Sequence, residues 1–227
     1  TGGAGFIGSH LVELLLKSKY KIVVIDIQKP HESYFFLNHL DKKVDYRIVD
    51  IRRKKQVDSL CLSLHPTYVI HLAAEAIVQN AYDYPCDAFK TNIMGTVNIL
   101  EACRKDSKIR RILVASSDKA YGKTKKAYTE SSPLQGDHPY DVSKSCEDLI
   151  AQTYFKTYGL PIIITRFGNV YGEGDLHFER LIPGICKALV TGKPFNVRSD
   201  GTYMRDYIYV KDVANGYMRL MKTKKNV

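Results

Sequence analysis

Short runs of apolar and β-branched residues recur along the chain, each with the length of a buried strand. They cover residues 21–25, 44–50, 68–74, 111–116, 161–166 and 206–210. The segments between them carry apolar residues at helical spacing. This predicts helices after residue 7, up to residue 64, over 86–105, 140–158 and 178–190, and from 210 to about 221. Strands that alternate with helices predict an α/β fold with a doubly wound parallel sheet.

The helix expected over 140–158 has signals at both ends. Asp137 is a candidate N-cap, and Pro139 suits the first turn because its missing N–H has no helical partner there. Gly159 follows the last residue and can adopt the left-handed conformation that ends a helix.

The first ten residues contain glycines in the spacing G-x-G-x-x-G, at Gly3, Gly5 and Gly8. Glycine permits a tight turn, a close approach of the backbone to a pyrophosphate and close packing of helix on strand. The following helix would offer its free N–H groups to the phosphates. The run 21–25 ends in Asp26, where an acid can bind the ribose 2′-hydroxyl of a dinucleotide. Together these features predict a dinucleotide site; the alternative is a structural turn followed by a strand that happens to end in Asp.

A glycine fingerprint of this kind normally follows a strand of the sheet. No apolar run stands before Thr1. We therefore expect a sheet that lacks its N-terminal strand, and a chain that is a fragment cut within the turn.

The composition is that of a globular protein. The 227 residues suffice for one large or two small domains, and 44% of them are apolar. No apolar run reaches the length of about 18 residues that spans a membrane. The 5 cysteines never form C-x-x-C. We therefore expect reduced thiols, a cytoplasmic location, no disulfide framework and no metal site.

The formal net charge is +10, and a basic chain raises the question of nucleic-acid binding. The basic residues cluster in expected loops such as 52–55 and 123–126, without interleaved aromatic residues. We therefore expect no nucleic-acid partner. An anionic small substrate would also benefit from the positive field.

Tyr140 and Lys144 lie four residues apart and so share one face of the predicted helix. A phenol titrates near pH 10, but a neighbouring ammonium stabilises the phenolate and lowers the pKa. Ser117, after the run 111–116, can hydrogen-bond the same substrate oxygen. Beside a nicotinamide, these three residues would form a proton acceptor for alcohol oxidation. For Tyr140 and Lys144 alone, the alternative is that both side chains are solvent-exposed neighbours on one helix without a role in catalysis.

Ordered motifs along nearly the whole chain resemble the extended short-chain dehydrogenase/reductase family, the NAD-dependent epimerases and dehydratases of nucleotide sugars. They are the glycine turn, Asp26, Asp50-Ile51, His71–Ala74, Asn92–Asn98, Ser117, Tyr140 with Lys144, Arg166–Gly172 and Gly201–Val210. The resemblance implies a Rossmann fold over residues 1–171. It also implies a smaller, partial nucleotide-sugar-binding region over 172–227, of which 206–220 returns to the sheet. A homodimer would pair through the helices 86–105 and 140–158.

The same resemblance implies NAD as the cofactor. Asp26 agrees, because its carboxylate would repel the 2′-phosphate of NADP. The expected NAD-binding residues are Gly2, Gly5, Phe6, Ile7, Gly8, Asp26, Asp50, Ile51, Leu72, Ala73, Ala74, Tyr140 and Lys144. The diphosphate of a nucleotide-sugar substrate is expected near Asn169, Arg180 and Arg205. For Arg205 the alternative is an ion pair with Asp206 or another acid.

The sequence Ser117-Asp118-Lys119 bears on the subgroup. An Asp followed by Lys resembles the CDP-glucose 4,6-dehydratases, whereas many related dehydratases carry Asp and then Glu. In the implied mechanism Tyr140 takes the O4 proton as C4 gives hydride to NAD. Lys119 removes the C5 proton, and Asp118 protonates the departing C6 hydroxyl. Lys119 must then be partly neutral and Asp118 protonated; the alternative is an ion pair between them, or a solvated lysine.

Three other functions remain open. A nucleotide-sugar 4-epimerase would use Tyr140 and Lys144 but not Lys119. A GDP-mannose-type 4,6-dehydratase and a non-catalytic NAD-binding protein are the others. Glu75 departs from the neutral Gln expected in similar dehydratases, and it either affects substrate choice or faces away. His71 is expected to be a packed core histidine rather than a metal ligand.

Overall fold

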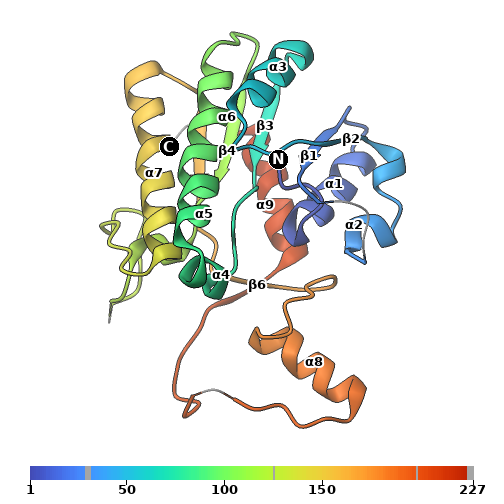
Figure 1. Ribbon diagram of the computed structural model, residues 1–227, viewed down its shortest axis with the longest axis vertical. Coiled ribbons are helices and arrows are strands. Elements are labelled where there is room, and N and C mark those ends of the chain that lie inside the picture. The colour runs from blue at the N-terminus through green and yellow to red at the C-terminus, as the bar shows by residue number, and fades with distance from the viewer. Residues whose placement is uncertain (29–31, 125, 198, 224–227) are drawn as a thin grey trace.

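The computed structural model describes residues 1–28, 32–124, 126–197 and 199–223. It forms a layered α/β body with helix α8 (Leu181–Thr191) set apart below it (Figure 1). The strands are β1 (Val23–Asp26), β2 (Asp45–Ile48), β3 (Tyr68–His71), β4 (Arg111–Ala115), β5 (Ile162–Thr165), β6 (Asn169–Tyr171) and β7 (Tyr207–Tyr209). The other α-helices are α1 (Phe6–Lys17), α2 (Tyr34–Leu37), α3 (Lys54–Leu64), α4 (Val78–Asp83), α5 (Pro85–Phe89), α6 (Gly95–Arg104), α7 (Pro139–Tyr158) and α9 (Val210–Lys222). Shorter helical turns are η1 (Asp41–Lys43), η2 (Lys90–Met94) and η3 (Asp118–Tyr121).

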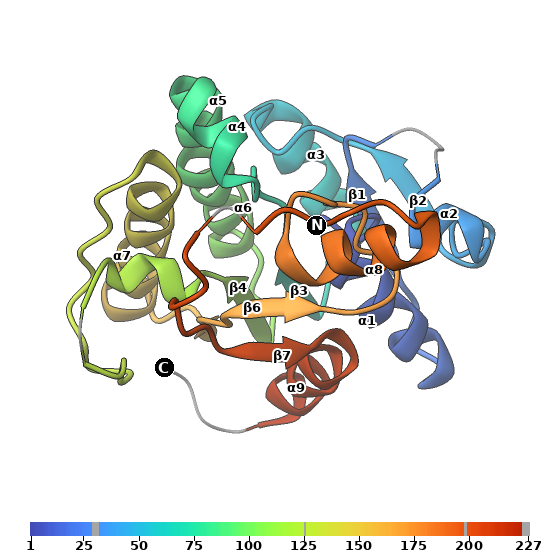
Figure 2. The ribbon, with the colours of Figure 1, turned by 90° about the horizontal axis from the view of Figure 1, so that it is seen from below.

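All strand pairs run parallel, which confirms the predicted α/β class. β1 pairs with β2, β3–β4–β5 form a sheet in that order, and β6 pairs with β7. Figure 2 shows β6 beside β7, with α9 directly after β7. The strands are shorter than predicted: the run 68–74 is a strand only to His71, because Leu72 and Ala73 hydrogen-bond to Thr1 instead.

Helices cover both faces of the central sheet. Because strand residues alternate between faces, Ile112 and Ile162 pack with α3, α6 and α7, whereas Leu113 and Ile163 pack with α1 and α9. Tyr217 of α9 is fully enclosed on the second face. The two apolar layers explain why the strands read as continuous apolar runs rather than alternating ones.

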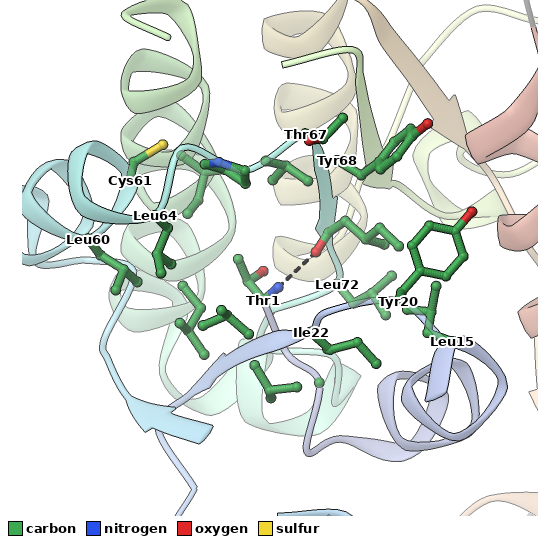
Figure 3. A pocket seen from close by; sticks show the side chains of 18 of the residues that line it. Thr1, Leu15, Tyr20, Ile22, Leu60, Cys61, Leu64, Thr67, Tyr68 and Leu72 are labelled. Carbon is green, nitrogen blue, oxygen red and sulfur yellow. Dashed lines mark hydrogen bonds between the residues drawn. The ribbon is translucent and has the colours of Figure 1, made fainter. Parts of the chain in front are cut away.

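Residues Thr1 and Gly2 lie between β1 and β3 and hydrogen-bond to both. The Thr1 amino group donates to Ile70 O at 2.8 Å, and Gly2 N donates to Ile25 O at 2.9 Å (Figure 3). Beyond them, a cavity of about 540 Å³ separates the two strands. It is lined mainly by apolar side chains of β1, β3, α1 and α3. The apolar lining of the cavity is that of a sheet interior.

Two helix predictions need correction. Asp137 is not the N-cap of α7: His138 holds that position without a side-chain cap bond, and the Asp137 carboxylate accepts from Lys123. Pro139 and Gly159 hold their predicted places. The helix expected over 178–190 begins at Leu181, because Arg180 bonds outside the helix to Asp175 and Val170.

The helix predicted over 86–105 is not a uniform α-helix. α5 and α6 are joined by a π-helical turn at Lys90–Met94. Within it the Asn92 side chain points inward to Glu75 and Ser143, and the Thr96 hydroxyl donates to Asn92 O. These side-chain contacts stabilise the turn, in which the backbone hydrogen bonds join residues five apart and not four. A simple helical period cannot reveal such contacts.

Within the described part of the chain, no helix is both long and apolar enough to cross a membrane.

The buried contact between Tyr217 Oη and Thr165 Oγ1, at 2.8 Å, yields a stability test. We expect Tyr217→Phe and Thr165→Val each to lower the free energy of unfolding by about 1 kcal/mol, because each leaves one buried hydroxyl without its partner or removes one hydrogen bond. The double variant should lose little more than either single one. Urea denaturation of the three variants measures this coupling, and fully additive losses would contradict the assignment.

Candidate active site

The glycine turn is built so closely that side chains do not fit in it. A Cβ on Gly8 would lie 2.2 Å from Gly2 O, and one on Gly2 would lie 2.5 Å from Ala73 N. Gly2 also has φ +69°, a conformation that glycine adopts without strain. The glycines are therefore required by backbone contacts as well as by any phosphate.

The N-terminus of α1 follows this turn directly. Gly5 is its N-cap, with no side-chain cap bond, and no acidic residue occupies its first turn. The N–H groups of Phe6, Ile7 and Gly8 thus lack helical acceptors, and the helix dipole adds positive potential. This combination suits an anionic phosphate.

Asp26 ends β1 beside this turn, where the sequence predicted it. Its Oδ2 accepts from Ala4 N at 3.0 Å, and its Oδ1 accepts from Ile27 N and Gln28 N. These bonds orient the buried carboxylate next to the glycine turn. A carboxylate offers about four acceptor positions, so one remains for a ribose hydroxyl.

The loop after β3 forms the next wall. Leu72 and Ala73 bond to Thr1, and Ala74 follows them. By contrast, Asp50 binds Arg52 in a two-pronged ion pair at the protein surface. Ile51 is buried against Gly95, whose Cβ would lie 2.5 Å from the Ile51 side chain. The structure therefore brings the Leu72–Ala73 pair to the turn, whereas Ile51 fills the core beneath α6.

Tyr140, Ser117 and Lys144 gather at the carboxyl end of β4. Tyr140 and Lys144 are both buried on α7, and Ser117 is the N-cap of η3. Burial raises the pKa of Tyr140, while the Lys144 charge and the Ser117 hydroxyl act in the opposite direction. The neighbouring ammonium predicted from the sequence is present, but burial outweighs its effect on the phenol.

The Lys144 ammonium has two acceptors. It donates to Ala115 O at 2.8 Å and to Glu147 Oε2 at 2.7 Å. The latter is an ion pair between two almost fully enclosed side chains. The sequence pattern does not reveal Glu147 as part of the site, because an acid three residues after a lysine on a helix is typical of an exposed pair.

Asp118 and Lys119 lie directly beside this group. Lys119 Nζ is 3.5 Å from Asp118 Oδ2, and Ser117 Oγ donates to Asp118 Oδ1 at 3.0 Å. The Asp118 side chain is 21% exposed and the Lys119 side chain is 36% exposed, so solvent reaches both. The structure thus shows the ion pair that the sequence left open as an alternative.

The three residues expected at the substrate diphosphate differ in how far their side chains are already bound within the protein. Arg180 is held by Asp175 Oδ2 at 2.7 Å and by Val170 O. Asn169 donates to Asp206 O across the β6–β7 pair. The Arg205 guanidinium lies over the Tyr203 ring, 5.0 Å from its centroid, and is exposed. Arg205 also donates to Met204 O, and of the two arginines it is the more exposed one.

Glu75 and His71 have structural partners. The Glu75 carboxylate accepts from Ile77 N at 3.0 Å at the start of α4. His71 is buried between the hydroxyls of Thr1 and Thr96. Its pKa is lowered well below the ordinary value by burial, and then by the charges of the N-terminus and Lys144. The predicted core histidine is therefore a neutral link between Thr1 and Thr96 of α6.

No cluster of three or more His, Cys, Asp or Glu side chains suited to a metal occurs among the residues that the structure describes.

Comparison with known proteins gives one family for the whole chain. The sequence pattern of the NAD dependent epimerase/dehydratase family matches residues 1–227. A relative from Arabidopsis thaliana is a trifunctional UDP-glucose 4,6-dehydratase/UDP-4-keto-6-deoxy-D-glucose 3,5-epimerase/UDP-4-keto-L-rhamnose-reductase. It is 35% identical over 225 residues, which cover 96% of this chain but 34% of the relative. The chain thus spans about a third of the length of this relative.

Solved structures of both enzyme types are similar to the chain. The UDP-glucose 4-epimerase of Thermotoga maritima, solved with UDP-glucose, has a TM-score of 0.89 at 29% identity, over 97% of this chain and 72% of that one. The dTDP-glucose 4,6-dehydratase of Streptomyces venezuelae, solved with NAD, has a TM-score of 0.88 at 31% identity, over 99% and 71%. With the glycine turn, Asp26 and the Tyr140–Lys144 pair in these positions, the chain belongs to the NAD dependent epimerase/dehydratase family.

Proposed function

We propose that the protein is an NAD-dependent nucleotide-sugar 4,6-dehydratase, which forms a 4-keto-6-deoxy sugar nucleotide. The observation that carries this proposal is the Asp118–Lys119 pair beside Ser117 and Tyr140. A 4-epimerase needs the phenol and the lysine, but it has no use for a second acid and base next to them. The named dehydratases among the relatives support the same choice.

The residues present fit NAD. The closely packed glycine turn and the uncapped start of α1 suit its pyrophosphate, and Asp26 suits the adenosine ribose. Leu72 and Ala73 would line the site, and Tyr140 with Lys144 would face the nicotinamide end. Bound NAD supplies the acceptor for the hydride that leaves C4 of the sugar, and later returns that hydride to C6.

The side chains of the protein move the protons. Tyr140, as phenolate, accepts the O4 proton while C4 is oxidised, and the new ketone acidifies C5. Lys119, as amine, removes the C5 proton. Asp118, as carboxylic acid, gives its proton to the C6 hydroxyl, which leaves as water. The return of hydride to C6 and of a proton to C5 completes the reaction with the net loss of one water.

The observed ion pair is one proton transfer away from the required forms. Moving a proton from Lys119 Nζ to Asp118 Oδ2, 3.5 Å apart, produces a neutral amine and a protonated acid together. Exclusion of water by a bound substrate favours this neutral pair, because the charged forms lose their hydration. The dehydratase chemistry therefore needs no net proton uptake from solvent at this step.

We further propose the type of substrate nucleotide, the domain bounds and a dimer. The Asp-Lys sequence favours a CDP-glucose-like substrate, with the diphosphate near Arg205 and Asn169. We assign the Rossmann domain to residues 1–171, and to the partial substrate-binding region residues 172–227, from which 206–220 returns to the sheet. A homodimer through α5–α7 would cover the exposed side chains of Met94, Leu149 and Tyr158.

The reaction type can be tested by product mass. We expect the complete protein with bound NAD to convert one of CDP-, dTDP-, UDP- or GDP-linked hexoses to a product lighter by one water, because Asp118 and Lys119 drive elimination. Mass spectrometry of each reaction measures this. A product of unchanged mass and inverted C4 would instead establish the epimerase.

The role of Lys119 can be tested separately. Lys119→Ala should reduce water loss by about 10²–10⁴-fold, because the C5 proton has no other positioned base. Oxidation at C4, seen as reduced cofactor absorbance, should persist in part. Lys123→Ala is the control, since that side chain is 85% exposed in the neighbouring loop. If both variants lose water from the substrate at the same rate, Lys119 is not the base that removes the C5 proton.

The glycine turn yields a cofactor-binding test. Gly8→Ala should weaken NAD binding at least about tenfold, because its Cβ would lie 2.2 Å from Gly2 O and force the turn open. The control is Gly216→Ala on helix α9. The atom nearest to its added Cβ is Phe167 Cζ at 3.5 Å, so the affinity for NAD should be kept. Calorimetric titration with NAD measures both, and equal affinities would contradict the assignment.

A further inference from the structure

Glu147 is an acidic side chain in a place that water does not reach. It lies on α7, one turn after Lys144, and is 1% exposed. Its Oε2 is 2.7 Å from the Lys144 ammonium, while the second acceptor of that ammonium, Ala115 O on β4, is neutral. Glu147 therefore provides the balancing charge in direct contact with Lys144.

The other acid next to this pair is already occupied. Asp148, also fully buried, binds the Arg166 guanidinium through both oxygens at 2.6 and 2.9 Å. It cannot serve Lys144 without leaving Arg166. The two adjacent acids of α7 thus pair with two different cations, and their roles are not interchangeable.

Burial and pairing act against each other on both partners. Burial lowers the pKa of Lys144, but the Glu147 carboxylate, together with Tyr140 and Asp148, more than offsets this, so that the pKa is raised overall. Burial raises the pKa of Glu147 to about 7, although the Lys144 charge opposes it. The charged form of each group is therefore stabilised by the other.

The remaining titratable groups that face the pair come from three elements. On α7 they are Tyr140 and Asp148. From α9, Tyr217 has its pKa raised by burial and, to a lesser extent, by Glu147. From β3, His71 senses the Lys144 charge. None of these can replace Glu147, because the tyrosines and His71 are neutral near pH 7 and Asp148 is bound to Arg166.

We propose that Glu147 is a positioning residue that keeps the buried Lys144 ammonium charged and fixed below Tyr140, and that its charge therefore governs the alkaline range in which the site can work. This inference rests on the proposed role of Tyr140 and Lys144. Without the carboxylate, the enclosed ammonium loses its counter-ion and is deprotonated at lower pH. The phenolate then loses the positive charge that stabilises it.

The first experiment is a pH–rate profile of the complete enzyme with bound NAD. In Glu147→Gln the alkaline limb should move to lower pH by about one unit or more, with about a tenfold loss of rate at pH 9. Near pH 6 the variant and the wild type should agree within about twofold, because Glu147 is mostly protonated there and carries no charge.

A matched control is Glu101→Gln. Glu101 also pairs with a cation three residues away on a helix, Arg104, but this pair is solvent-exposed. Its profile should follow the wild type. A Glu147→Gln profile that is lowered equally at every pH, moves to higher pH or does not change would overturn the proposal, since a merely structural contact lowers the height of the profile without moving it.

The second experiment does not depend on turnover. In protein labelled with [¹³Cδ]glutamate, the resonance absent from Glu147→Gln should titrate with a midpoint of about 7. Lys144→Met should move this midpoint higher, because the neutral acid is favoured when the cation is lost. The Glu101 resonance serves as the internal control. A Glu147 midpoint near the ordinary value of about 4.3, or one unaffected by Lys144→Met, would overturn the pair.

The two experiments separate the inference from the proposed function. If no nucleotide sugar is turned over but the ¹³C titration behaves as expected, the Glu147–Lys144 coupling holds and the reaction assignment fails. If turnover is found and the midpoint is ordinary, the function holds and the positioning role of Glu147 fails.

Discussion

The contact on which the site depends is the backbone pairing of Thr1 and Gly2 with two strands at once. Through it β1 and β3 keep the relation of neighbours in a sheet, although a cavity separates them lower down. The pairing leaves no room for a side chain at Gly2 or Gly8. It also aims the start of α1 across the carboxyl ends of the strands, where ligands bind in open parallel sheets. The closeness of the glycine turn therefore follows from how tightly two strands and a helix are joined.

Helix α7 supplies the second half of the site, and it does so from a buried position. Its Tyr140, Lys144, Glu147 and Asp148 are all enclosed, which is unusual for so many polar side chains on one helix. Each charge has a specific partner: Lys144 has Glu147, and Asp148 has Arg166. Removing one member of such a pair leaves an uncompensated charge, so the helix tolerates few single changes. The same enclosure gives the lysine its influence on the phenol, because charges interact strongly where water is excluded.

The pattern of apolar residues and glycines along the sequence predicted those parts of the fold that depend on neighbouring residues. Apolar runs located every described strand except β6 to within a few residues. The glycine spacing located the tight turn before α1, and Asp26 lies beside that turn as expected. The errors arise from side-chain contacts and burial, which the periodicity of apolar residues does not report. The helix expected from residue 178 begins at Leu181, because Arg180 is held by Asp175 and Val170, and His138 rather than Asp137 is the N-cap of α7. Glu147 was not recognised, because periodicity cannot tell a buried acid from an exposed one when its partner shares the helix.

The π-helical turn at Lys90–Met94 sets a limit on how this region can vary. One residue more than an α-helical turn requires is accommodated there, so everything after it is rotated by about 100° relative to a regular helix. Within the turn Asn92 points toward Ser143, and directly after it Gly95 packs on Ile51. Deleting a single residue between α5 and α6 would restore ordinary helical geometry and at the same time turn these groups away from their partners. The contacts of this segment therefore depend on its number of residues as well as on their identity.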